Sequence, residues 1–126
     1  MVSLMTGIPD IQAESFEEEV KNAGGAVVLE FWIRSCSVCQ KFKPVYDRLP
    51  DVMGDRVRFL RMNMMKSIEN LRLAEGMGVE ATPTTKVFCK GDEVGEIVGY
   101  RPLEEAVKEI EGALSETACS LPKRLI

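Results

Sequence analysis

The chain combines two kinds of apolar pattern, continuous apolar runs and apolar residues at helical spacing, separated by short polar segments. Continuous runs predict buried strands, and apolar residues three or four positions apart predict amphipathic helices. The predicted strands span residues 26–32, 57–63, 84–89 and 93–98, the last two joined by a turn at 90–92. The predicted helices span residues 13–23, 37–53, 67–77 and a last stretch from Pro102 to Leu114, with a kink expected at Pro44. This order of elements predicts an α/β fold with a mixed sheet.

Length and composition indicate one folded domain. The 126 residues, 45% hydrophobic and 29% charged, can bury a single core. We assign residues 1–115 to this domain and 116–126, which lack periodicity, to a C-terminal tail. A net charge of −4 has the wrong sign for nucleic-acid binding. No apolar run approaches the ~20 residues of a membrane span, and residues 1–5 lack the regions of a secretory signal. We therefore expect a cytoplasmic monomer that binds neither nucleic acid nor membranes.

Two cysteines, Cys36 and Cys39, stand where the first predicted strand gives way to the second helix. Thiols at this spacing can close and reopen a small disulfide, and the amides of a helix N-terminus stabilise a thiolate. Cys36 is therefore the expected attacking thiol, and Cys39 the buried resolving thiol. The alternatives are two buried structural cysteines or half of a zinc site, but zinc normally takes four ligands. Only Cys89 and Cys119 remain as thiols, and the chain has no histidine, so we expect no metal.

One carboxylate, Glu30, interrupts the first apolar run. Burial would raise its pKa and make it a candidate proton acceptor for Cys39, directly or through a water. An isolated buried charge is costly, so Glu30 needs a partner. We expect Lys86 to be that partner, with Arg61 in reserve; the alternative is an exposed glutamate at a sheet edge. Cys89 and Cys119 are interpreted as incidental thiols, although a regulatory or intermolecular disulfide between them stays open.

Over about residues 8–115 the sequence resembles the thioredoxin superfamily. The matching features are the strand before the first cysteine, a proline five residues after the second, a Thr-Pro-Thr segment and two hairpin glycines. These are residues 29–32, Pro44, residues 82–84, Gly91 and Gly99. The resemblance implies a mixed five-stranded sheet flanked by four helices.

The resemblance also implies further site residues. Pro83 should follow a cis peptide bond and pack against the disulfide, with the Thr82 backbone and Gly99 binding an extended client segment. Trp32 should pack under the active-site turn, and the motif interior, Ser37 and Val38, should tune the thiols.

Three residues are closer to the catalytic domains of protein disulfide isomerases: Glu30 itself, Lys86 opposite it and Arg101 before the last helix. Arg101 could approach Cys39 and lower its pKa, or be a plain surface arginine.

Together these features predict a thiol–disulfide oxidoreductase acting on protein disulfides without a cofactor, restored by a reductase or a low-molecular-weight thiol. Because the motif lacks the proline of thioredoxins and places Ser37 near the sulfur, we expect a more oxidising pair than theirs. Two alternatives stay open. One is a redox-sensing or partner-binding module without turnover, and the other is a metal site bridging two chains through Cys36 and Cys39.

Overall fold

The structure is a computed structural model that describes residues 7–122. Its elements in chain order are η1 (Ala13–Ser15), η2 (Glu17–Lys21), β1 (Ala26–Trp32), α2 (Ser37–Met53), β2 (Val57–Asn63), α3 (Ile68–Gly76), β3 (Thr84–Cys89), β4 (Asp92–Val98) and α4 (Leu103–Leu114). The α/β prediction is confirmed, and each predicted strand agrees with its observed bounds to within one residue. Residues 1–5, considered above for a secretory signal, and the last four residues of the predicted tail, 123–126, lie outside the described residues.

The first predicted helix, residues 13–23, differs from expectation because it is not one regular α-helix. A 3-10 turn, η1, is followed by a short π-helix, η2, and the segment buries Val20 and Phe16 against the sheet. Three successive glutamates open η2, where the positive helix end favours them.

The sheet is mixed and has the order β2-β1-β3-β4. β1 runs parallel to β2 and antiparallel to β3, and β3 pairs antiparallel with β4. The expectation of a fifth strand is wrong for the described residues. The N-terminal segment forms only an isolated bridge between Asp10 and Arg61. Pro9 accepts one hydrogen bond there, from Arg61 N–H at 2.9 Å, but it has no N–H to extend the ladder.

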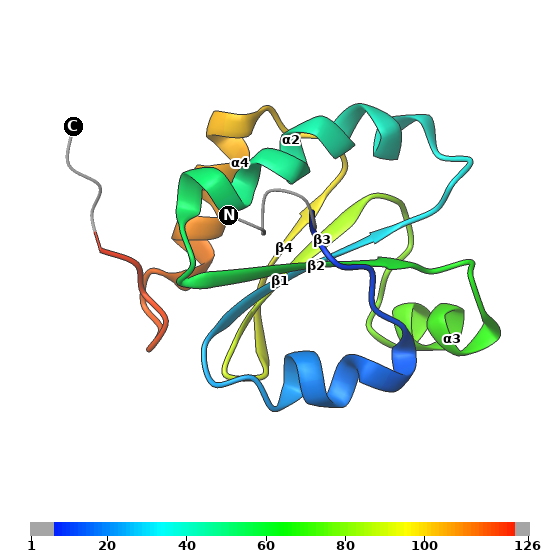
Figure 1. The fold of residues 1–126 in the computed structure, drawn as a ribbon, viewed down its shortest axis with the longest axis horizontal. Helices are drawn as coiled ribbons and strands as arrows, with labels where there is room; N and C mark the ends of the chain where they lie inside the picture. The colour runs from blue at the N-terminus through cyan, green and yellow to red at the C-terminus, as the bar shows by residue number, and fades with distance from the viewer. Residues whose placement is uncertain (1–6, 123–126) are drawn as a thin grey trace.

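Helices cover both faces of the sheet (Figure 1): α2 and α4 lie on one side, and α3 with the N-terminal helical segment lies on the other. Side chains of β1 therefore alternate between two cores. Val28 packs with α2 and α4, whereas Leu29 and Phe31 pack with the N-terminal segment and with Ala74 of α3. Burial on both faces explains why β1 reads as a continuous apolar run. It also means that Glu30 belongs to the α2 side.

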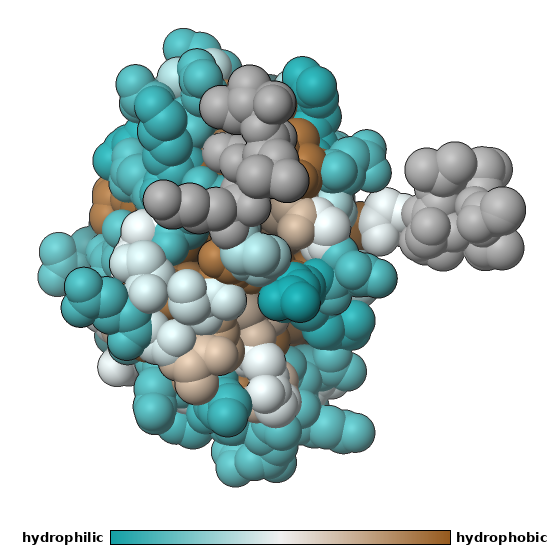
Figure 2. All heavy atoms as spheres, turned by 90° about the vertical axis from the view of Figure 1, so that its left-hand side faces the viewer, coloured by the Kyte–Doolittle hydropathy of each residue, from teal (hydrophilic) through white to brown (hydrophobic). Residues whose placement is uncertain are grey.

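The last described residues are tied to the sheet by a disulfide. Cys89, the end of β3, is bonded to Cys119, with their Cα atoms 5.8 Å apart. The interpretation of these cysteines as incidental thiols is therefore wrong, because α4 returns the chain to the end of β3. Cys119 and Leu121 also pack against the core beside α4. Figure 2 shows the left-hand side of Figure 1, where hydrophilic residues dominate and hydrophobic atoms show between them.

Candidate active site

Cys36 and Cys39 are free thiols at the start of α2, just beyond the carboxyl end of β1. Cys36 is the N-cap, with extended backbone, and its Sγ accepts a hydrogen bond from the Cys39 N–H at 3.0 Å. This contact satisfies one of the amides that a helix N-terminus leaves without an internal partner. Cys36 is partly exposed, whereas Cys39 is only 2% exposed. The predicted burial of Cys39 is thus confirmed.

The surroundings separate the pKa values of the two thiols. Desolvation acts to raise the pKa of Cys36, but hydrogen bonds with Cys39, Thr82 and the Val38 backbone outweigh it, and the pKa falls below its usual 9.0. Burial, followed by the hydrogen bond with Cys36, raises the pKa of Cys39 to about 11. One thiol can therefore become a nucleophilic thiolate while the other keeps its proton.

The loop before β3 lies directly beside Cys36. The Thr82–Pro83 peptide bond is cis, which confirms that prediction. The Thr82 carbonyl oxygen lies 3.4 Å from Cys36 Sγ, and the Gly99 N–H donates to the Pro83 carbonyl at 2.8 Å. Gly99 has φ +92°, a conformation that glycine adopts without strain. The structure therefore brings Thr82, Pro83 and Gly99 together next to Cys36.

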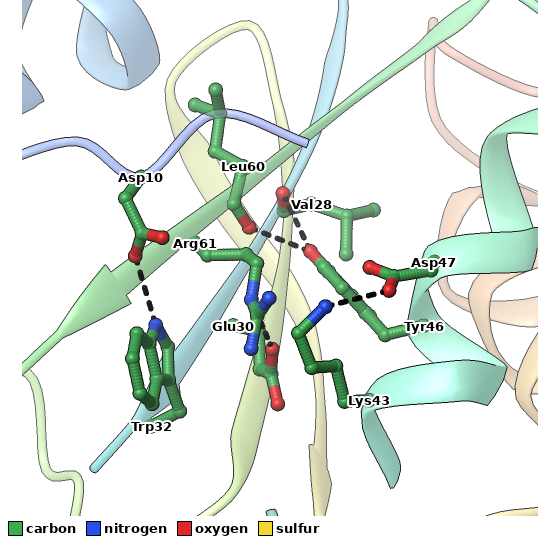
Figure 3. Close-up of polar contacts among 9 residues, drawn as sticks. All are labelled: Asp10, Val28, Glu30, Trp32, Lys43, Tyr46, Asp47, Leu60 and Arg61. Atoms are coloured by element: carbon green, nitrogen blue, oxygen red, sulfur yellow. Dashed lines mark hydrogen bonds and ion pairs between the residues drawn. The ribbon is translucent and has the colours of Figure 1, made fainter. Parts of the chain in front are cut away.

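Glu30 is fully buried and pairs with Arg61, whose Nε donates to Oε1 at 3.1 Å (Figure 3). Burial raises the pKa of Glu30 to about 7, because desolvation of the carboxylate outweighs its attraction to Arg61. The second carboxylate oxygen, Oε2, and the Oγ1 of Thr85 are buried without a hydrogen-bond partner among the described residues. Thr85 lies directly opposite Glu30 on β3.

The expected ion pair between Glu30 and Lys86 is wrong. Lys86 Nζ lies 2.7 Å from Glu93 and 3.0 Å from Glu96, both on β4. The sheet register explains the difference, because Lys86 is opposite Leu29 and therefore shares the face that Leu29 occupies. Arg61, the reserve partner, is level with Glu30 on the parallel strand β2, so the two side chains share one face.

Arg101 lies in the connection between β4 and α4. Its Nε donates to Glu109 at 2.7 Å, and Nη1 donates to the carbonyls of Val98 and Tyr100. These contacts fit the surface-arginine interpretation and tie the start of α4 to β4.

Trp32 ends β1 and is held by two groups on its flanks. Its Nε1–H donates to Asp10 at 2.9 Å, and the Arg61 guanidinium lies 4.9 Å from its ring centroid (Figure 3). A cavity of about 260 Å³ beside it is lined by Asp10, Trp32, Arg61 and Cys39. Cys39 and Arg61, the partner of Glu30, therefore open onto one cavity. Sequence reasoning missed Asp10, which lies outside any periodic segment.

Tyr46 on α2 is a second residue that the sequence did not single out. Its buried hydroxyl lies 2.7 Å from the Leu60 carbonyl and 3.2 Å from the Val28 carbonyl. The ring thus ties α2 to β1 and β2 next to Glu30 (Figure 3). A tyrosine at a core position of an amphipathic helix was the available signal.

Ser37 and Val38, the residues between the two cysteines, both face solvent at the first turn of α2, and Val38 is 41% exposed. Within residues 7–122, no group of three or more potential metal-binding side chains comes together. In the same range no helix has the length and apolar character to cross a membrane.

The thioredoxin family model matches residues 7–112, nearly the whole of the described chain. The chain belongs to the thioredoxin family. Among its relatives, a thioredoxin of Bacillus subtilis is 32% identical over 97 residues, 77% of this chain and 88% of that protein. A thioredoxin of Synechocystis sp. is 27% identical over 107 residues, 85% of this chain and 97% of that protein.

Solved structures agree with this family assignment. Thioredoxin f from spinach chloroplast, in its short form, superposes with a TM-score of 0.75 at 28% identity, covering 85% of this chain and 93% of that one. The Malassezia sympodialis thioredoxin gives 0.71 at 25% identity, covering 85% and 92%. Both therefore share the α/β arrangement of this member of the family.

Proposed function

We propose that this protein is a thiol–disulfide oxidoreductase that exchanges electrons with protein disulfides through Cys36 and Cys39. The observation that carries the proposal is the asymmetry of the pair. Cys36 is partly exposed with a lowered pKa, and Cys39 is buried with a pKa raised to about 11. Membership of the thioredoxin family supports the same chemistry.

In the reducing direction, the Cys36 thiolate attacks one sulfur of a client disulfide. A Cys36–client S–S bond forms, the client S–S bond breaks, and the departing client thiolate takes up a proton from water. Cys39 then loses its proton and attacks Cys36 Sγ, which releases the second client thiolate and closes the Cys36–Cys39 disulfide. Two electrons pass to the client, and a reductase or a low-molecular-weight thiol must supply two more for the next cycle.

Glu30 is the proposed acceptor of the Cys39 proton. A carboxylate with a pKa of about 7 is matched to proton transfer at neutral pH. The cavity lined by Cys39 and by Arg61, the partner of Glu30, has room for a water that could take part in this proton transfer. Arg61 acts as a positioning residue, because its charge partly offsets the desolvation of the Glu30 carboxylate.

The backbone beside Pro83 is the proposed client-binding edge. Thr82 lies within 3.4 Å of Cys36 Sγ, so an extended client segment paired with this backbone would carry its own sulfur to the thiolate. Gly99, whose N–H donates to the Pro83 carbonyl, has no side chain that could cover this edge beside Pro83.

The test is a redox titration in glutathione and dithiothreitol buffers, with accessible thiols counted by alkylation. A background of Cys89→Ser and Cys119→Ser removes the second disulfide from the count and serves as the matched control. We expect one two-electron transition in this background, at a potential above the roughly −270 mV of thioredoxins. The Cys36→Ser variant should lose the transition, and Cys39→Ser should accumulate a mixed disulfide with glutathione.

Absence of any transition would exclude the oxidoreductase and favour a module that binds partners without turnover.

A further inference from the structure

A groove of about 580 Å³ lies next to the cysteine pair, between the end of α3, the loop before β3 and the loop after β2. The apolar part of its lining comes from Ile33, Met64, Met65 and Val79. Thioether side chains adapt their shape to different neighbours, so this part of the groove can accept varied side chains. Met65 is 61% exposed, which makes it an open wall rather than part of the core.

This groove continues into the candidate active site. Thr82 is one of its lining residues, and the Thr82 carbonyl oxygen is the atom 3.4 Å from Cys36 Sγ. A client whose disulfide meets Cys36 therefore has the residues that flank its cysteine at the mouth of the groove.

The charge of the groove is one-sided. Glu75, near the end of α3, and Glu80, two residues before Thr82, both line it and are both exposed. Neither carboxylate forms a hydrogen bond or ion pair with any residue in the described part of the chain, and no lysine or arginine of that part lines the groove. Other glutamates of the protein, such as Glu93 and Glu109, are engaged by basic side chains. Glu75 and Glu80 are therefore available to a ligand.

We infer that Glu75 and Glu80 select clients whose reactive cysteine is flanked by lysine or arginine. This inference rests on the proposed oxidoreductase function and names its substrate class. The long stems of these side chains can lie along Met65 and Val79 while their charged ends reach the carboxylates. Glu80 is two residues before Thr82, the residue beside Cys36 Sγ. Because an extended segment advances ~3.3 Å per residue, a cation two or three residues from the client cysteine has the reach to approach Glu80.

The experiment uses three peptides whose single cysteine carries a thionitrobenzoate leaving group. The peptides differ only at the second and third positions on each side of the cysteine. These positions are all arginine in one peptide, all glutamine in the second and all glutamate in the third. The rate of release of the coloured thiolate by the reduced protein gives the second-order rate constant for each peptide. Two ion pairs at an exposed site give a preference of about three- to tenfold for the arginine over the glutamate peptide at low salt, with glutamine between. The preference should shrink in 0.5 M NaCl.

The double variant Glu75→Gln, Glu80→Gln should bring the rates for the three peptides together. The matched control, Glu17→Gln, Glu18→Gln, makes the same charge change on η2, which leads into the opposite end of β1, and should keep the preference. Equal rates in the unmodified protein, or a preference that persists in the first double variant, would overturn the inference and leave the proposed function standing. If the reduced protein reacts with none of the three peptides, the inference and the proposed function are both overturned.

Discussion

Replacing Glu30 by glutamine tests the most consequential electrostatic feature of the site. Glu30 is fully buried, and its pKa is raised from 4.5 to about 7 by desolvation that Arg61 only partly offsets. Between pH 4.5 and about pH 7 the carboxyl group is therefore protonated in the folded protein but ionised in the unfolded chain. Glutamine keeps the size and shape of the side chain but cannot titrate.

The size of the effect follows from proton linkage. A group whose folded pKa lies above its unfolded pKa stabilises the fold fully below pH 4.5, and this stability is lost as the pH rises through 7. A shift from 4.5 to about 7 corresponds to a loss of about 3.5 kcal/mol, at roughly 1.4 kcal/mol per pKa unit. Most of this loss falls between pH 5 and pH 8. The free energy of unfolding of the unmodified protein should therefore fall across that range.

Urea unfolding followed by the fluorescence of the single tryptophan, Trp32, measures this slope at pH 5, 6, 7 and 8. The chain has no histidine, so few other side chains titrate in this range. A Cys36→Ser background also removes the thiol whose pKa is lowered. In that background Glu30→Gln should give a nearly flat profile, whereas Glu17→Gln on exposed η2 should keep the slope. The slope is the readout because glutamine also leaves Arg61 without its carboxylate. An unchanged slope in Glu30→Gln would refute the electrostatic argument.

Three further variants test the packing of the fold by urea unfolding. The double variant Cys89→Ser, Cys119→Ser removes a disulfide that spans 30 residues and should lower the free energy of unfolding by about 3.5 kcal/mol. A loss under about 1 kcal/mol would mean that the disulfide does not fix the tail. Gly91→Ala places a methyl group against the Lys21 backbone at φ +87° and should cost about 2 kcal/mol or more; Gly24→Ala, with open space around it, is the control and should stay within about 0.5 kcal/mol. Tyr46→Phe removes the hydroxyl bonded to Leu60 and should cost about 1–2 kcal/mol, and no change would show that the Leu60 carbonyl does not depend on it.

Most of the fold could be predicted from the sequence because three of the four strands, β1, β2 and β3, are largely buried on both faces. Such strands are continuous apolar runs, and their bounds at residues 26–32 and 57–63 agree with the structure. The N-terminal segment was less predictable. The resemblance suggested a fifth strand, but Pro9 limits this chain to one bridge with β2. The irregular helices η1 and η2 follow from packing on the sheet, which local propensity does not report.

The cysteines show where sequence reasoning ended. Cys36 and Cys39 are adjacent in sequence to a helix start, so their site could be recognised locally. The bond between Cys89 and Cys119 depends on where α4 delivers the chain, which no local pattern encodes. Disulfides persist mainly in oxidising compartments, so the cytoplasmic assignment stays a prediction that this bond makes worth testing.

The partner of Glu30 was decided by the pleat of the sheet rather than by residue type. Lys86 and Arg61 are both basic and both lie on strands next to β1, but only Arg61 is in register with Glu30. The difference has a chemical consequence, because a buried lysine can lose its proton whereas an arginine cannot. With arginine as its partner, Glu30 titrates against a fixed positive charge, so in the proposed mechanism the Cys39 proton has one acceptor in this pair. Exchange of Arg61 for lysine would add a second ionisable group, and the single Glu30 titration would become that of a coupled pair.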